Sequence, residues 1–417
     1  MKKSLGILFT IIIMVTIFSG CIKDNCSREN TYTYFMPVYK TTAEVKANIK
    51  SNTARLVENP GKLFIRGNYI FLNEVDKGIH IINNANPAKP VNVAFVDIPG
   101  NLDLAVNGNA LYADLYTDMV TLDISNPLNV IVKKYNEGVF PFRKYSYGFS
   151  GDTSKIITDW IRRDTTVITD CSKGFFLSGS YMDKSFSTNA SQSVSPSPVG
   201  KGGSMARFAL TTNKLYTVSN SDLNVFNTSK EFEPNFITKV NLGNWAIETI
   251  FPMKNKLFIG SQTGMYIYDI TNPNNPVEAG KFSHVRSCDP VIADDDYAYV
   301  TLRSGTACQG FSNQMEVLKL NNLHDVQLVK TYPLANPHGL SKDGDILFIC
   351  DGKDGLKIYD AANVNDMKLI KQFKGIDTYD VIALNNIALV VAKDGFYQYD
   401  YTNVKDIKLI SKMGVGK

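Results

Sequence analysis

The sequence is poor in the residues and motifs from which most catalytic and metal sites are built. It has only 4 His among its 417 residues, and none shows the spacing to another His or to Cys that a zinc site requires. It contains no G-x-S-x-G elbow, no phosphate-binding P-loop and no dinucleotide fingerprint. We therefore expect no cofactor and no metal site, and the sequence favours a protein without catalytic activity.

An excess of charge of one sign is also missing, because 44 Lys and Arg stand against 40 Asp and Glu. No block of basic residues gives the electrostatic footprint of a nucleic-acid-binding protein, so we expect no nucleic-acid partner. The Asp-rich segments 294–296 and 351–355 lack the spacing of an EF-hand calcium loop, and hairpin turns explain both. Tyr and Phe, in contrast, are abundant, as is typical of strand-rich chains.

Long apolar runs are absent except at residues 5–18, directly after two lysines. A run of about 14 residues has the length of a signal-peptide core and is too short for an ordinary membrane-spanning helix. It ends in Phe18-Ser19-Gly20-Cys21, which resembles a bacterial lipoprotein signal; a plain secretory signal with a chance Cys is the alternative. We expect a signal peptide over 1–20, and a lipidated Cys21 at the start of a polar tether over 21–33 that anchors the chain stably in a membrane.

Cysteine is scarce as well, with 6 residues in the chain. Export permits disulfides, and once the lipidated residue is set aside an odd number remains, so at least one stays free or pairs outside the chain. Cys288 and Cys308 flank a predicted hairpin over 291–302, and we predict a disulfide between them. Cys350 lies on an apolar strand and is predicted to be a buried thiol.

What the chain does contain is an internal repeat. A turn of the type Asp-x-Ser/Thr-Asn-Pro occurs at 123–127 and 269–273, and related turns occur at 83–87, 360–364 and 400–404. Asp and Asn end a strand by accepting hydrogen bonds from nearby backbone N–H groups, and Pro fixes φ where no ladder donor is needed. The recurrence predicts that each unit ends its third strand in the same way.

A second landmark, the apolar strand that precedes the one ending in this turn, gives the period. Its copies begin at residues 69, 110, 155, 214, 256, 297, 345 and 386. Most of the spacings lie close to the ~40–45 residues of a four-stranded propeller blade. Because successive antiparallel hairpins with this period are typical of a β-propeller, we predict an all-β fold with a single β-propeller over 34–417.

The number of blades depends on the third unit. Eight hairpins favour eight blades, but the third hairpin, 156–161 with 165–169, precedes a Ser-, Gly- and Pro-rich stretch at about 170–205. We expect this stretch, including 192–204, to be a surface insertion. If the third unit forms no complete blade, the ring has seven. The strand-like segment 32–39 is expected to pair with the last blade and close the ring.

These repeats resemble the LVIVD-repeat proteins, a family of predicted β-propeller lipoproteins in Bacteroidetes and related bacteria. The matching parts are the Asp-x-Ser-Asn-Pro turns and the segments 78–81, 111–114, 289–291 and 298–303, and the similarity runs from about Lys62 to the C-terminus. The resemblance implies a propeller outside the cytoplasm. Together with the N-terminal signal it implies an outer-membrane lipoprotein, on the periplasmic or cell-surface face. It implies no characterised reaction.

The strands that open each unit carry one set of candidate site residues, because such strands line the central channel of a propeller. The set comprises Asp103, Glu248, Asp289, His338 and Asp380. One interpretation is a mostly acidic ring at the channel mouth that holds a cation or a basic group of a ligand. The other is structural: each side chain accepts hydrogen bonds from a neighbouring blade and holds the blades in register.

Three functions remain open. The preferred one is a lipid-anchored, non-enzymatic binding scaffold at the cell envelope, whose protein or glycan partner is recognised by the insertions at 170–205 and 304–313. The second is a glycan-active hydrolase or lyase that uses two ring carboxylates, with Asp289 and Asp380 as the pair to test. The third is a structural envelope protein without a soluble ligand.

Overall fold

The structure is a computed structural model that describes residues 27–143, 151–170, 201–243, 246–284, 290–305 and 312–416. In these ranges the chain forms α2 (Thr42–Ala47), and its other regular elements are β-strands. No helix in this part of the chain is long and apolar enough to cross a membrane. The chain divides into two compact units, Met1–Met36 with Trp160–Ser185 and Pro37–Asp159 with Phe186–Lys417.

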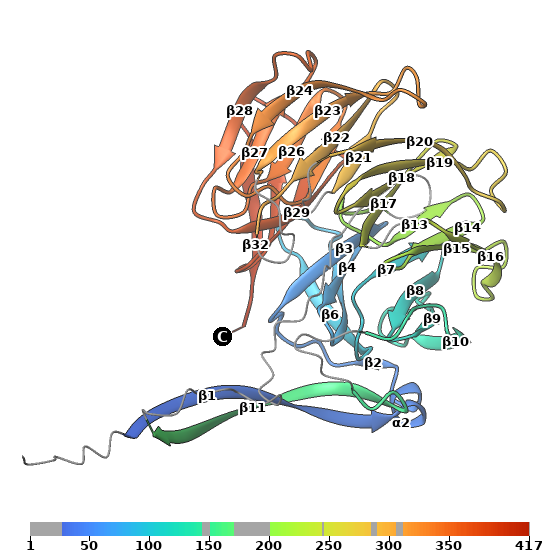
Figure 1. Cartoon of the computed structure of the whole chain (residues 1–417), viewed down its shortest axis with the longest axis vertical. Helices are drawn as coiled ribbons and strands as arrows, with labels where there is room; N and C mark the ends of the chain where they lie inside the picture. Colours follow the sequence, from blue (N-terminus) through green and yellow to red (C-terminus); the bar gives the residue numbers. More distant parts are fainter. Residues whose placement is uncertain are drawn as a thin grey trace, which may run out of the picture. The chain divides into compact units, whose positions relative to one another are not determined.

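The larger unit is a β-propeller with seven blades among the described residues (Figure 1). Each blade is an antiparallel sheet built around four strands that follow one another in the chain. Blade one comprises β3 (Pro60–Arg66), β4 (Tyr69–Glu74), β5 (Gly78–Asn83) and β6 (Val91–Asp97), and blade two comprises β7 (Leu104–Asn107), β8 (Ala110–Leu115), β9 (Asp118–Asp123) and β10 (Ile131–Asn136).

Blades three to seven have the same order of four strands. Blade three comprises β13 (Phe208–Thr211), β14 (Lys214–Val218), β15 (Asp222–Asn227) and β16 (Asn235–Asn241), and blade four comprises β17 (Ile247–Met253), β18 (Lys256–Ser261), β19 (Gly264–Asp269) and β20 (Val277–Ser283). Blade five comprises β21 (Val291–Ala293), β22 (Tyr297–Leu302), β23 (Gln314–Lys319) and β24 (Gln327–Pro333). Blade six comprises β25 (Leu340–Asp343), β26 (Ile346–Cys350), β27 (Leu356–Asp360) and β28 (Lys368–Phe373), and blade seven comprises β29 (Thr378–Leu384), β30 (Ile387–Ala392), β31 (Gly395–Asp400) and β32 (Lys408–Gly414).

The order of the strands within a blade follows from which faces are covered. The first strands contact one another from blade to blade and therefore line the central channel. The second strands are buried on both faces and read as continuous apolar runs, as β30 shows. The fourth strands lie at the outer edge and are largely exposed, as β32 shows. Two short strands extend blade one, β12 (Lys201–Gly202) beside β3 and β2 (Ser51–Asn52) beside β6.

The repeated turns end the third strands as predicted. Asp269 accepts a hydrogen bond from the backbone N–H of Thr271 at 2.7 Å, and Asp400 accepts one from Thr402 at 2.8 Å. Cys350, on the second strand of blade six, is a free and fully buried thiol, also as predicted.

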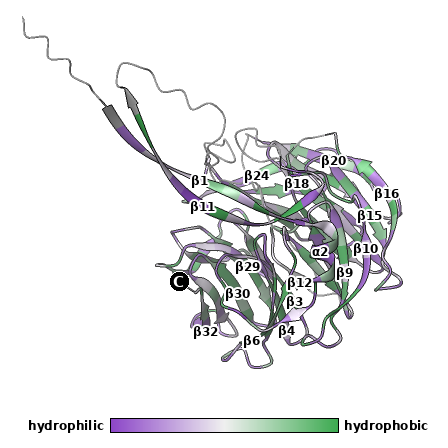
Figure 2. Ribbon diagram, turned by 90° about the horizontal axis from the view of Figure 1, so that it is seen from below, coloured by the Kyte–Doolittle hydropathy of each residue, from purple (hydrophilic) through white to green (hydrophobic). Residues whose placement is uncertain are grey.

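The ring has seven blades, the alternative count, and the favoured count of eight is wrong. Residues of the third unit form one continuous strand, β11 (Lys155–Asp170), which pairs with β1 (Ser27–Thr41) in a separate two-stranded sheet (Figure 2). The hairpin predicted at 156–169 does not form: in the Arg-Arg-Asp sequence at 162–164 only Asp164 favours a turn, and the strand continues through it. The prediction that 32–39 pairs with the last blade is also wrong, because this segment belongs to β1 and pairs with β11.

Blade seven meets blade one without exchanging a strand. Apolar side chains from both blades form one cluster, in which Leu63 and Ile70 of blade one pack with Ile382 and Phe396 of blade seven. Gln398 adds polar contacts across this seam: its amide exchanges two hydrogen bonds with the Asn84 side chain, at 2.9 and 2.7 Å, and donates a third to the Pro87 carbonyl at 3.0 Å. Side chains, rather than a shared strand, therefore close the ring.

Candidate functional site

Four of the five predicted ring residues belong to the described chain, and all four lie at the beginning of first strands. Asp103 and His338 come just before β7 and β25, whereas Glu248 and Asp380 lie within the first residues of β17 and β29. Each is buried, and none is more than 7% exposed. Because the first strands begin at one end of the channel, these four residues lie at that end. Asp289, Cys21, Cys288 and Cys308 lie outside the described residues, so the lipidation and the disulfide stay predictions.

A short segment, residues 201–207, crosses this end of the channel, and we call it the strap. It pairs with β3 of blade one, where the Gly203 N–H also donates to the Leu63 carbonyl at 3.3 Å. The Ile250 N–H of blade four donates to the strap's Ala206 carbonyl at 3.0 Å. The Leu340 N–H of blade six donates to Ser204 Oγ at 2.6 Å.

The strap also reaches blades two, three and seven. The Arg207 N–H donates to Asp103, and the Val218 N–H of blade three donates to the Arg207 carbonyl at 2.8 Å. The Ser204 N–H donates to Asp380 Oδ1 of blade seven at 3.1 Å. One heptapeptide is thus hydrogen-bonded to six of the seven blades. The prediction that 192–204 is a surface insertion is wrong for its last residues, because Ser204 is fully buried.

Asp380 is the ring residue most tightly enclosed by the strap. A Cβ on Gly203 would lie 1.5 Å from Asp380 Oδ2, and a Cβ on Gly339 would lie 2.1 Å from Oδ1, so both positions require glycine. Asp380 Oδ1 accepts hydrogen bonds from Ser204, but Oδ2 is buried without a hydrogen-bond partner among the described residues. Burial raises the pKa of Asp380 to about 7, although its hydrogen bonds to backbone and the nearby Lys62 act in the opposite direction.

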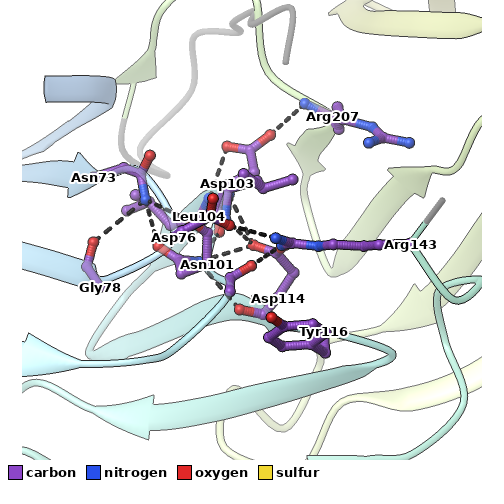
Figure 3. A network of polar contacts seen from close by, with 12 residues as sticks. Asn73, Asp76, Gly78, Asn101, Asp103, Leu104, Asp114, Tyr116, Arg143 and Arg207 are labelled. Carbon is purple, nitrogen blue, oxygen red and sulfur yellow. Dashed lines mark hydrogen bonds and ion pairs between the residues drawn. The ribbon is translucent and has the colours of Figure 1, made fainter. Parts of the chain in front are cut away.

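Asp103 belongs to a polar network that joins blades one and two to the strap (Figure 3). Its Oδ2 lies 3.2 Å from Lys62 Nζ, and both side chains are only 3% exposed. Burial lowers the pKa of Lys62, and the Asp103 charge offsets only part of this effect. Asp114 Oδ1 accepts hydrogen bonds from the backbone N–H groups of Leu102 and Asp103, both at 2.8 Å. Arg143 bonds to Asp76 and to the Gly100 carbonyl in the same network.

Glu248 and His338 lie on the other side of the ring, in blades four and six. Gln262 donates to Glu248 Oε1 at 2.9 Å. The Nε2 atom of His338 lies 3.4 Å from Arg303 Nη1 and 3.2 Å from Asn336 Nδ2. Burial, and then the Arg303 charge, lower the pKa of His338 to about 3, so the imidazole is neutral at physiological pH.

These contacts favour the structural interpretation of the ring over an open acidic collar. Asp103 and Asp380 bond to the strap, His338 contacts Arg303 of the neighbouring blade five, Glu248 bonds to Gln262 of its own blade, and Asp380 is shut from solvent. Within the described ranges no group of three or more His, Cys, Asp or Glu is arranged to hold a metal ion. In the Asp-rich segment 351–355, Asp351 accepts hydrogen bonds from backbone N–H groups of Ala335 and Asn336 and pairs with Lys357 at 2.6 Å. This carboxylate therefore fixes a loop.

Sequence reasoning missed the strap, Lys62 and Arg207. Lys62 occupies in blade one the position that the ring residues occupy in their blades. Because Lys62 is basic, it did not fit the mostly acidic ring that the sequence predicted. The signal for the strap was weak: Gly202, Gly203 and Ser204 are small enough for close backbone approach, but the same composition is typical of surface loops.

Both insertions enter the propeller at the end of the channel that carries the ring. The stretch 170–205 leads through the strap into the beginning of β13, a first strand. The stretch 304–313 joins the end of β22 to the beginning of β23, and second strands end where first strands begin because the two are antiparallel. The Asn-Pro turns lie at the opposite ends of the strands. The described residues that flank these two insertions on the propeller, Lys201 on one side and 304–305 with 312–313 on the other, thus lie at this end of the channel.

Comparison with known proteins supports the repeat and the fold. The LVIVD repeat matches residues 101–135 and 255–283, which fall in blades two and four. No curated protein matches the chain. A periplasmic gluconolactonase of Pseudomonas aeruginosa, PpgL, is similar in structure with a TM-score of 0.54 at 11% identity, over 86% of this chain and 96% of that one.

Two further solved structures are similar to the same extent. A protein from Lactobacillus plantarum gives a TM-score of 0.54 at 12% identity, over 85% of this chain and 96% of that one. A computationally designed protein gives 0.52 at 9% identity, over 88% and 91%. At such low identities these likenesses concern the fold alone. The chain therefore carries LVIVD repeats on a β-propeller, and its activity has to be argued from its own residues.

Proposed function

We propose that this protein is a lipid-anchored, non-enzymatic binding scaffold at the cell envelope, and that its partner binds the face of the propeller that carries the two insertions. The observation that carries this proposal is that 170–205 and 304–313 both join the propeller at the end of the channel where the ring residues lie. Loops that depart from a uniform repeat are where partner-specific contacts collect. A protein or a glycan of the envelope is the class of partner that an extracytoplasmic scaffold meets.

The state of the ring supports binding rather than chemistry. A glycosidase needs two carboxyl groups about 5–10 Å apart in an open pocket. Asp103 and Asp380 are instead buried and hydrogen-bonded to the strap, and Asp103 also pairs with Lys62. The strap crosses the end of the channel at which these carboxylates lie. Asp289, the other member of the pair to test for catalysis, lies outside the described residues.

Crosslinking of intact cells followed by affinity capture tests the proposal. The first variant replaces 192–199 with a Gly-Ser linker of equal length and leaves the strap, which starts at Lys201, in place. The matched control replaces 271–274, a turn at the opposite ends of the strands, in the same way. We expect the first variant to lose partners that the control retains. Retention of every crosslinked partner by both variants would refute recognition by this insertion.

The anchor has its own test. Growth with an alkyne-labelled fatty acid should label the wild-type protein, and the Cys21→Ser variant should be unlabelled and should leave the membrane fraction. Two acyl chains give stable anchoring, whereas one chain binds only marginally. Fatty-acid labelling that persists in the Cys21→Ser chain would contradict lipidation at Cys21 without bearing on the insertions.

A further inference from the structure

The smaller unit contains a β-ribbon made of Ser27–Met36 of β1 and Trp160–Asp170 of β11. Two side-chain contacts fix its register: Thr31 Oγ1 lies 3.1 Å from Thr166 Oγ1, and Thr33 donates to Asp164. Moving two residues forward on β1 moves two residues back on β11, so the strands are antiparallel. The same register sets Met36 opposite Ile161.

The two faces of this ribbon differ in chemistry. Alternation along the strands puts Thr31 and Thr33 on one face with Arg162, Asp164 and Thr166, and their side chains bond to one another. The polar face also carries Phe35, Trp160 and Ile168. The opposite face carries five aromatic or aliphatic side chains and three polar ones. We call it the apolar ribbon face; its members are Asn30, Tyr32, Tyr34, Met36, Ile161, Arg163, Thr165 and Val167.

The apolar ribbon face is most accessible at the end that carries Met36 and Ile161, whereas Tyr32, Tyr34 and Val167 are half-buried. Met36 is 46% exposed and Ile161, its cross-strand neighbour, is 45% exposed. A two-stranded sheet is at most marginally stable in water unless a further layer covers its apolar side. We therefore expect another surface to cover the apolar ribbon face. The position of the ribbon in the chain indicates which surface this is.

The ribbon begins close to the residue that is proposed to carry lipid. Six residue steps separate Cys21 from Ser27, and a fully extended chain covers ~21 Å over that number of steps. If Cys21 is acylated, the start of β1 has to stay within this short distance of the bilayer surface. No other described segment is held so close to the anchor by the length of the chain.

We propose that the apolar ribbon face lies on the lipid surface next to the anchor, with Tyr32 and Tyr34 at headgroup level. This rests on the lipid anchor proposed above. Tyr is enriched at membrane interfaces, where its ring is buried and its hydroxyl stays wet, and an arginine such as Arg163 extends its charged end into the headgroups. The ribbon has three Arg (Arg28, Arg162 and Arg163) and three acidic residues (Glu29, Asp164 and Asp170), so apolar contact rather than net charge drives this binding.

Tryptophan fluorescence of the full, lipidated protein in vesicles tests this. Both native tryptophans are first changed to Phe (Trp160→Phe and Trp245→Phe), which leaves a chain without Trp. Ile161→Trp then probes the apolar ribbon face. Ile168→Trp is the matched control, since Ile168 lies on the same strand, is 69% exposed and belongs to the polar face. The vesicles contain phosphatidylethanolamine and phosphatidylglycerol, with or without brominated lipid as a quencher.

We expect the Ile161→Trp chain to emit at shorter wavelength than the Ile168→Trp chain and to lose more intensity to brominated lipid, at low and at high salt. Equal quenching at both positions, with acylation of Cys21 confirmed by mass spectrometry, would overturn the ribbon's role and leave the anchor intact. A blue shift without quenching would also overturn it, because the face would then be covered by protein. An unacylated Cys21 would remove the anchor and the lipid contact together.

Discussion

At the scale of single residues, two buried groups on neighbouring blades respond to pH in opposite directions. Asp380 has its pKa raised to about 7 by burial, from 3.8 when exposed. Between these values the folded state holds a proton that the unfolded state has released, so this group's contribution to stability is present below pH 4 and is lost as pH rises to 7. The full shift corresponds to about 4 kcal/mol.

His338 acts in the other direction. Its pKa falls from 6.5 to about 3, so between these values the unfolded state binds a proton and the folded state does not. This group's contribution to stability is therefore present above pH 6.5 and is lost as pH falls toward 3. The pH ranges in which Asp380 and His338 titrate overlap. In the wild-type protein their opposite effects on the free energy of unfolding therefore largely cancel as pH changes.

We predict that substituting either residue makes the effect of the other on the pH dependence of the free energy of unfolding measurable. In Asp380→Asn the free energy of unfolding should rise by a few kcal/mol from pH 4.5 to pH 6.5, because His338 remains. In His338→Gln it should fall over the same range, because Asp380 remains. Urea denaturation at closely spaced pH values measures both. Parallel pH profiles for the two variants would show that neither group is perturbed as the structure indicates; the double variant, with neither slope, is the control.

At the scale of elements, the strap depends on a glycine that faces Asp380. In Gly203→Ala the new Cβ would lie 1.5 Å from Asp380 Oδ2, so the strap or the strand has to move. Overpacking of this kind costs about 1–3 kcal/mol of stability. We predict that adding Asp380→Ala to Gly203→Ala recovers part of this loss, as a double-mutant cycle in urea would show.

Gly414→Ala serves as the control for this cycle, because the nearest atom to its Cβ would be 4.0 Å away. It should change stability little, and it should not be affected by Asp380→Ala. If Gly203→Ala were as mild as Gly414→Ala, the strap would not be packed against Asp380.

The sequence was sufficient to predict the blades, and it failed for the strap and the ribbon. Blade strands are recognisable because local alternation and the Asn-Pro turns repeat every ~40–45 residues. The strap has no such pattern: Ser204 is buried because it lies in the channel, and nothing local records this. In β11, Ile156 and Ile157 matched the start of a blade strand, and only the missing turn at 162–164 distinguished the segment from a hairpin.

The channel residues show the same limit. Asp103 and Asp380 could be found from the sequence because they occupy equivalent positions in the repeat. Their partners could not, since Arg207 and Ser204 come from a segment outside any repeat and meet them only in the folded ring. The positions of these carboxylates in the blades could be predicted from the sequence, but their hydrogen-bond partners could not.

At the scale of the whole molecule, the seam between blades seven and one is marked by polar residues. At the position two residues before the end of each third strand, five blades carry Ile or Val, blade two carries Thr121 and blade seven carries Gln398. The residue after the third strand is Asn84 in blade one, whereas it is apolar or Tyr in all other blades except blade three, where it is Thr228. Five of the seven seams are thus apolar at both positions.

The two polar seams are the ones that the chain itself does not join directly. Gln398 and Asn84 belong to the last and first blades, and Thr121 and Thr228 belong to blades two and three, between which the chain leaves the repeat. A ring with seven identical apolar seams would permit blades to meet in a wrong order or across two molecules. The hydrogen-bonded pair of Gln398, which is buried, and Asn84, which is half-buried, penalises such contacts at the closing seam, because a wrong partner leaves both amides without these hydrogen bonds.

We therefore predict strong coupling between Asn84 and Gln398. Gln398→Val alone leaves the Asn84 amide without its partner and should cost about 1–3 kcal/mol. Asn84→Ile together with Gln398→Val gives this seam the apolar pair of the others, and should recover stability in urea. The double variant should also form more dimers and higher oligomers on refolding, measured by light scattering, because its closing seam no longer rejects the wrong blade. Additive losses without extra oligomers would mean that the ring is closed by the apolar cluster of Leu63, Ile382 and Phe396 alone.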